Sequence, residues 1–220
     1  MATSVVTASS VKKVQAALTF NGSGYIGLPY WPERNLEINI AKEVHPKLGP
    51  AKKEAALQAA CEKHGITLEQ YQRTCELANR PFYTVDGTRN GEIVIPQRVI
   101  QSFLNHASMS APKAIPKIAE KGLTFIGVKI ADGFLRTGKT EKNAKKFERF
   151  VKMAESNQRS FASDFYIDDF TARGVFQVDE EVIKVEDLRK LMEYGGRWYG
   201  IGSARPQGFG RFQVTGWDMV

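Results

Sequence analysis

Six segments with the periodicity of strands or helices follow one another in an order that few folds accommodate. Alternating or continuous apolar residues predict strands at 11–20, 123–130, 174–178 and 212–217, and apolar residues three and four positions apart predict helices at 96–109 and 185–194. This sequence of elements predicts an α+β fold with a ferredoxin-like, RRM-like β-α-β-β-α-β core. The strand at 123–130 is apolar almost throughout, so we expect it in the centre of the sheet.

Two long stretches, at about 29–91 and 134–171, interrupt this core, and we interpret them as insertions into a single domain of residues 1–220. Four prolines between 29 and 50 surround one short apolar segment, so no core element is expected there. Helices are expected at 51–64 and at 67–79, where Thr67 and Gln70 form a capping-box pattern. A small β-hairpin of 82–85 with 92–95 then leads back to the core.

An excess of positive charge favours polyanionic partners, since 31 Lys and Arg face 24 Asp and Glu and give a formal charge of +7. Cys61 and Cys75 lack the second pair that a disulfide framework or a zinc site needs, and the three histidines lack a metal-ligand spacing. Neither a metal nor another cofactor is therefore expected. No stretch approaches the roughly 18 apolar residues of a membrane span, and the N-terminus lacks a secretion signal, which predicts a cytoplasmic protein without a membrane partner.

A glycine-rich loop between the last predicted helix and the last predicted strand is the most informative motif. Residues 200–211 contain two G-x-G pairs separated by five residues, and Gly195 and Gly196 before them are expected to end the helix at 185–194. Glycines permit positive φ and close backbone approach, so N–H groups can line a phosphate-binding concavity to which arginines add contacts. The residues predicted to bind RNA phosphates are Gly200, Gly202, Ser203, Arg205, Gly208, Phe209, Gly210 and Arg211.

A plain connecting turn is the alternative interpretation of this loop. A dinucleotide fingerprint is excluded, because that motif follows a strand and opens a helix, whereas this loop leaves a helix and enters a strand.

The segment 136–159 carries most of the excess positive charge, with eight basic residues against three acidic ones. A helix over 140–154 would bring basic residues three and four positions apart onto one face, with Phe147, Phe150 and Val151 on the other. Such a stripe can follow a sugar-phosphate backbone, and a solvated helix face is the alternative. The cations predicted to contact RNA, in this segment and in the helix at 96–109, are Arg136, Lys139, Lys142, Lys145, Lys146, Arg149 and Arg98.

Aromatic and acidic side chains follow the basic segment. Exposed aromatic rings could stack on bases, although aromatic residues at these spacings more often lie in a core. The rings concerned are those of Phe161, Phe165, Tyr166 and Phe170. Three carboxylates also cluster here, those of Asp164, Asp168 and Asp169. Magnesium prefers such ligands, but we favour the interpretation that these carboxylates offset neighbouring positive charges or cap turns.

The glycine loop, with Arg211 and Phe212 after it, resembles the C-terminal G-rich loop of the RAMP superfamily of CRISPR-associated proteins. Ile95 and Pro96, which open a predicted helix, resemble the family's Ile-Pro-Gly-Ser-Ser-Leu segment, with Gln97 and Arg98 where Gly and Ser are expected. The resemblance implies RRM-like units that grip RNA. It also implies a place among the backbone subunits that line a guide RNA in antiviral ribonucleoprotein complexes, with copies of itself or sister subunits, and a target nucleic acid, as partners.

Three hypotheses for the function follow. The first is a non-catalytic RNA-binding subunit that holds guide RNA with the glycine loop and the basic insertion. The second is a metal-independent endoribonuclease that processes CRISPR repeats, in which His106 acts as general base or acid on a ribose hydroxyl. The third is a basic structural or assembly protein of a phage or mobile element, in which the loop is only a turn.

Overall fold

The computed structural model describes residues 10–22, 24–27, 31–113, 115, 127–152 and 159–220. The chain divides into two compact units, one of residues 1–27 and 84–220 and the other of residues 28–83. The second unit takes up most of the first predicted insertion. None of the described helices is both long and apolar enough to cross a membrane.

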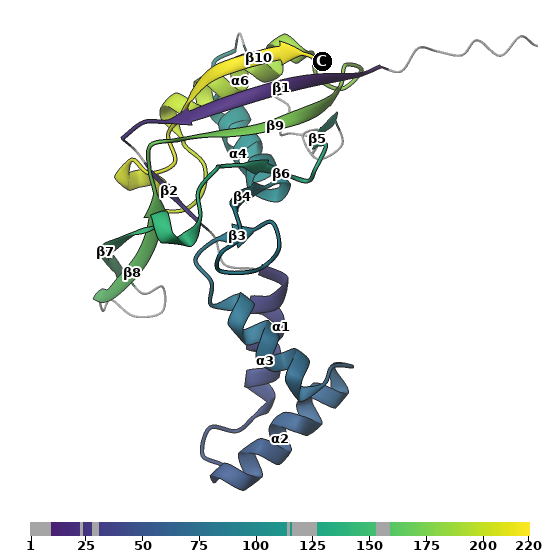
Figure 1. Cartoon of the computed structure of the whole chain (residues 1–220), viewed down its shortest axis with the longest axis vertical. Coiled ribbons are helices and arrows are strands. Elements are labelled where there is room, and N and C mark those ends of the chain that lie inside the picture. Colours follow the sequence, from purple (N-terminus) through teal and green to yellow (C-terminus); the bar gives the residue numbers. More distant parts are fainter. Residues whose placement is uncertain (1–9, 23, 28–30, 114, 116–126, 153–158) are drawn as a thin grey trace, which may run out of the picture. The chain divides into compact units, whose positions relative to one another are not determined.

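The larger unit is built on a mainly antiparallel sheet (Figure 1). Its strands lie in the order β10 (Gln213–Met219), β1 (Val11–Phe20), β9 (Phe170–Asp179), β6 (Phe134–Arg136), β4 (Ile93–Pro96) and β3 (Tyr83–Thr84), and β5 (Val128–Ile130) also pairs with β9. β1 lies between β10 and β9 and is antiparallel to both. The fold is therefore α+β, as predicted, and the predicted strands at 11–20, 174–178 and 212–217 and the predicted pairing of 82–85 with 92–95 are confirmed.

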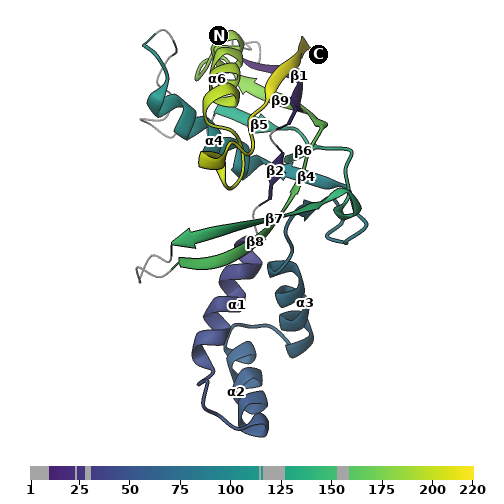
Figure 2. The ribbon, with the colours of Figure 1, turned by 90° about the vertical axis from the view of Figure 1, so that its left-hand side faces the viewer.

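Burial in β1 alternates as its sequence predicts. Val14, Ala16, Leu18 and Phe20 are buried, whereas Lys13 before them and Gln15 between the first two are exposed. The buried face is covered by α4 (Gln97–Ser110) and α6 (Val185–Trp198), which lie on the same side of the sheet in Figure 2. The predicted helix after Pro96 is confirmed, with Pro96 as its N-cap residue.

The glycine pair in α6 does not end the helix, which continues through Gly195 and Gly196 to Trp198. A Cβ at position 195 would lie 2.5 Å from Cζ of Phe103 on α4, and one at position 196 would lie 2.7 Å from the carbonyl oxygen of Phe212. The predicted helix end at Tyr194 is therefore wrong, because these glycines serve the close approach of α6 to its neighbours. Helix packing outweighs the low helix propensity of glycine at this point.

The strand predicted at 123–130 is described only in its last part, since positions 123–126 lie outside the described residues. Among the described strands, β5 pairs with β9 alone, so the predicted central position is wrong for this part. Side chains of α4 bond the backbone of β5: Gln97 Oε1 accepts from the N–H of Ile130 at 2.8 Å, and Gln101 Nε2 donates to the carbonyl of Val128 at 3.4 Å. A strand that is apolar almost throughout can thus pair with one strand only and have its other backbone groups bound by a helix.

The basic segment forms a β-hairpin, so the predicted helix at 140–154 is wrong. β7 (Lys145–Lys152) pairs with β8 (Arg159–Ile167), and β2 (Tyr25–Ile26) completes this second sheet (Figure 2). Side chains alternate between the two faces of a strand, so Lys145 and Lys146 point to opposite sides and do not share the face that the predicted helix would have given them. Aromatic and β-branched residues in both strands favour this pairing over the local helical spacing.

The smaller unit contains α1 (Trp31–Glu43), α2 (Pro50–Lys63) and α3 (Leu68–Ala78). Ile40, Val44, Ala60 and Cys61 form its buried core. The helix α1 was not predicted from the proline-rich stretch 29–50; Pro32 lies in its first turn, where the missing N–H costs no intrahelical bond. The predicted helices at 51–64 and 67–79 are confirmed, as is the capping box at Thr67.

Candidate nucleic-acid interface

The glycine loop folds back on itself beside the turn that follows β1. Gly200, Gly202, Gly208 and Gly210 all have positive φ, between 78° and 92°. The N–H of Ile201 donates to the carbonyl of Gly210 at 2.8 Å, and the N–H of Gly210 donates to the carbonyl of Gly24 at 2.7 Å. A Cβ at Gly210 would collide with the backbone of Ile201, so the two arms of the loop can approach this closely only with glycine.

Many amides of the loop are engaged within the chain. Besides the two bonds of Ile201 and Gly210, backbone carbonyls accept from the N–H groups of Gly200, Ser203, Gln207, Gly208 and Phe212. Within the part of the chain that the structure describes, the N–H groups of Gly202, Ala204, Arg205 and Phe209 have no such bond. The glycines therefore shape the loop, and about half of its amides are engaged within the chain.

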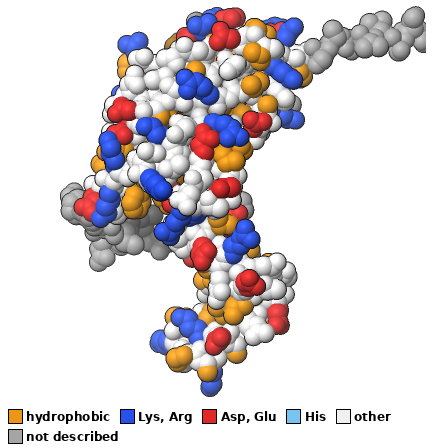
Figure 3. All heavy atoms as spheres, viewed as in Figure 1, with side chains coloured by type: hydrophobic (Ala, Val, Ile, Leu, Met, Phe, Trp, Pro, Cys, Tyr) orange, Lys and Arg blue, Asp and Glu red, His pale blue; other side chains and the backbone are white. Residues whose placement is uncertain are grey.

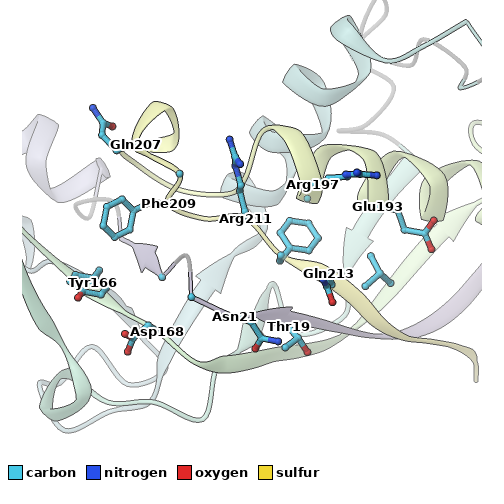
Figure 4. Close-up of a pocket in the computed structure, with 16 residues that line it drawn as sticks. Thr19, Asn21, Tyr166, Asp168, Glu193, Arg197, Gln207, Phe209, Arg211 and Gln213 are labelled. Carbon is cyan, nitrogen blue, oxygen red and sulfur yellow. The ribbon is translucent and has the colours of Figure 1, made fainter.

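The second arm of the loop borders an open cleft of about 950 Å³. Figure 4 shows Gln207, Phe209 and Arg211 along the loop, with Thr19 and Asn21 at the end of β1 opposite them. The cleft is lined by Thr19, Asn21, Gly22, Gly24, Tyr166, Asp168, Glu193, Gly196, Arg197, Gln207, Gly208, Phe209, Arg211, Phe212, Gln213 and Val214.

Two arginines and two carboxylates line this cleft, and both carboxylates have a cationic partner. Lys145 Nζ donates to Asp168 at 2.7 Å, which raises the pKa of that lysine, and Arg189 Nε donates to Glu193 at 3.0 Å. The guanidinium groups of Arg197 and Arg211 thus give the cleft a net positive character.

An aromatic cluster joins the loop to the β7–β8 hairpin. The ring of Phe209 lies 4.7 Å from the ring of Phe147 on β7 and 5.3 Å from the ring of Tyr166 on β8, between centroids. The glycine loop and the basic insertion, two separate features of the sequence, therefore meet at one wall of the cleft.

Of the residues predicted to bind RNA, Gly208, Phe209 and Arg211 line the cleft. Gly200 and Gly210 are buried in the base of the loop, Gly202 and Ser203 lie against β2, and Arg205 begins a short 3-10 turn. The other predicted cations are not among the described residues that line the cleft: Arg98, Arg136, Lys139, Lys142, Lys145, Lys146 and Arg149.

Several of these cations have acidic partners. Arg136 pairs with Glu92 at 3.0 Å, Lys145 with Asp168, and Lys146 with Glu148. The side chain of Arg149 lies outside the described residues. On the face shown in Figure 3, Lys and Arg side chains are interspersed with Asp and Glu.

Sequence reasoning missed Arg197, Asn21 and Gln213, which also line the cleft. Arg197 lies one turn before the loop in a Gly-Gly-Arg-Trp-Tyr-Gly segment, and this proximity to the glycines was the available signal. Gln213 follows the loop by two positions, whereas Asn21 comes close to it through the pairing of β1 with β10, which no local pattern reports.

The remaining candidates lie elsewhere or are paired. His106 is exposed on α4 with Nδ1 2.7 Å from the carbonyl oxygen of Ser102, and it is not among the described residues that line the cleft. Asp169 accepts from the N–H of Gly22 at 3.4 Å, as a turn-capping carboxylate does. The part of the chain that the structure describes contains no group of three side chains able to hold a metal.

The two cysteines and the aromatic residues divide between core and surface. Cys61 is buried, which raises the pKa of its thiol, and Cys75 is half-buried. Phe170 is buried and stacks on Phe20 with ring centroids 4.5 Å apart, whereas Phe165 is 42% exposed. The side chain of Phe161 lies outside the described residues.

No protein-family model matches the sequence, and no curated protein matches it. The structure matches a chain in a cryo-EM structure of the Type III-B Cmr-beta assembly bound to cognate target RNA, with a TM-score of 0.51 and 9% identity over 96% of this chain. This chain spans 61% of the length of that protein. Cmr6 from Pyrococcus furiosus matches over 93% of this chain and 98% of its own, with a TM-score of 0.35 and 9% identity. The predicted resemblance is thus confirmed at the level of architecture: the chain has a fold similar to that of a chain in a Type III-B Cmr assembly.

Proposed function

We propose that the chain is an RNA-binding subunit of a CRISPR-associated ribonucleoprotein complex and holds the backbone of one RNA strand in the cleft beside the glycine loop. The observation that carries this proposal is the pair of arginines, Arg197 and Arg211, in an open cleft whose two carboxylates are already paired. Guanidinium groups bind phosphate oxygens with two parallel hydrogen bonds, which fixes a strand without reading its bases.

The polar groups around the arginines suit a ribose-phosphate chain. Asn21, Gln207 and Gln213 present amide groups to the cleft, and such groups donate to phosphate and accept from ribose hydroxyls. The backbone at Gly208 has no side chain, so a phosphate can come close to it.

The fold supports an RRM-like unit as the frame of this site. A ferredoxin-like core with β1 and β9 at its centre is supported by the pairing of β1 with β10 and β9 and of β5 with β9, and by the places of α4 after β1 and α6 after β9. The matched chain belongs to an assembly bound to target RNA, which supports guide RNA, a target strand and sister subunits as partners of this chain. We infer from the same match that it acts inside the cell.

The test compares RNA affinity with and without the two cleft arginines. We expect the double variant Arg197→Gln/Arg211→Gln to bind fluorescent single-stranded RNA roughly tenfold or more weakly, because each charge-assisted hydrogen bond contributes about 1.5–3 kcal/mol. In a titration between about 50 and 200 mM salt, the slope of log affinity against log salt should fall by about 0.7 for each phosphate group that the variant no longer binds.

The matched control is Lys12→Gln/Lys13→Gln, which removes the same charge from exposed positions of β1 roughly 20 Å from the cleft end of that strand. Its affinity should change little. Equal losses in both variants would mean that net charge alone attracts RNA, as in the assembly-protein hypothesis. RNA cut by the wild-type protein and spared by His106→Ala would favour the endoribonuclease hypothesis instead.

A further inference from the structure

Trp198, the last residue of α6, has a side chain that is 58% exposed. Tryptophan is highly buried on average, because its large ring gains most from leaving water. Trp217, by comparison, is partly buried and lies against Phe176 with ring centroids 6.0 Å apart. Trp198 therefore presents a large stacking surface to solvent, and none of the ring–ring contacts among the described residues involves it.

The ring of Trp198 adjoins the cleft through Arg197. The guanidinium carbon of Arg197 lies 5.2 Å from the ring centroid of Trp198, at the distance of a cation–π contact, and Arg197 lines the cleft. A strand whose phosphate is bound by Arg197 therefore has this ring within the reach of its next base.

The surroundings of Trp198 suit a nucleobase better than a protein partner. The other exposed residues in the last two turns of α6 are Glu193 and Arg197, both charged. The core of a protein interface is depleted of charged residues and formed by neighbouring apolar side chains. A single aromatic ring beside cations is the arrangement with which proteins bind single-stranded nucleic acids.

We propose that Trp198 stacks on a nucleobase of the RNA strand whose phosphates are bound by Arg197 and Arg211. This inference rests on the proposed function and adds to it a base-binding position outside the cleft. Every nucleobase presents a π-face, so the position accepts all four bases and adds affinity without sequence preference.

The experiment follows intrinsic tryptophan fluorescence and affinity together, with a short single-stranded RNA as the probe. We expect the RNA to quench the fluorescence of the wild-type chain, and the quenching to be lost in Trp198→Phe, which keeps an aromatic ring and most of the affinity. Trp198→Ala should bind about 5- to 100-fold more weakly. Its salt dependence should equal that of the wild type, because stacking releases no counterions.

Two controls test whether the effect is specific to Trp198 and to one base of the RNA. Met109→Ala removes a side chain of α4 that is 61% exposed and should leave affinity unchanged. Probes with one abasic position, placed at each site of the strand in turn, should include one that wild type binds more weakly than intact RNA. Trp198→Ala should not distinguish that probe from intact RNA.

The stacking inference would be overturned if RNA left the fluorescence of the wild-type chain unquenched and Trp198→Ala bound RNA as tightly as the wild type. A dependence of RNA affinity on Arg197 and Arg211 would still support the proposed function. If RNA affinity were independent of both arginines, both proposals would fail. Loss of self-association in Trp198→Ala, with RNA affinity intact, would assign this ring to a protein contact and also overturn the inference.

Discussion

Gly208 differs from the other three glycines of the loop, because a Cβ at this position would meet no atom within 4 Å. Its φ of 92° strains any other residue by about 1–2 kcal/mol, and this cost is similar for Asn and Asp. Gly208→Asn and Gly208→Asp therefore differ mainly in one negative charge beside the cleft. We expect the Asp variant to bind single-stranded RNA several-fold more weakly than the Asn variant in an anisotropy titration, with the difference shrinking at high salt. Equal affinities of the Asn and Asp variants would show that RNA phosphates do not pass close to Gly208.

Sequence patterns predicted residues whose role is local and missed those whose role depends on distant partners. The capping box at Thr67 needs only Gln70, three positions away, and was predicted correctly. Gly195 and Gly196 were predicted to end the helix, because the contacts that require glycine at these positions, with α4 and with Phe212, involve residues distant in the sequence. The loop glycines were identified from the sequence, whereas the partners of their amides required the structure.

Elements were predicted well where burial follows their own periodicity. α4 buries one face through Val99, Ile100, Phe103 and Leu104, so its pattern was sufficient. β7 was predicted as a helix because its basic residues have helical spacing, whereas pairing with β8 and the contact of Phe147 with Phe209 determine its conformation. Non-local pairing of this kind overrides local spacing.

The contact between the hairpin and the loop can be measured as a coupling energy. In a double-mutant cycle, Phe147→Ala and Phe209→Ala should each lower the free energy of unfolding in urea, and their effects should couple by about 0.5–1.5 kcal/mol. Phe165→Ala, at a position of β8 that is 42% exposed, is the control and should show no coupling to Phe209→Ala. Additive effects of Phe147→Ala and Phe209→Ala would show that the rings do not hold the hairpin to the loop.

At the scale of the whole molecule, each of the two units has its own buried core, so we expect them to unfold as separate cooperative steps. Thr67→Ala removes the capping box of α3 and should lower the stability of the smaller unit by about 1 kcal/mol. Gly196→Ala forces a methyl group against Phe212 and should lower the stability of the larger unit by about 1–3 kcal/mol. In calorimetry, each variant should lower the midpoint temperature of one transition and leave the other unchanged.

RNA bound in the cleft should raise only the midpoint temperature that Gly196→Ala lowers, because ligand binding stabilises the unit that contains the site. A single transition shifted by both variants would contradict independent units, and stabilisation of the Thr67-dependent transition by RNA would place the binding surface on the helical unit instead.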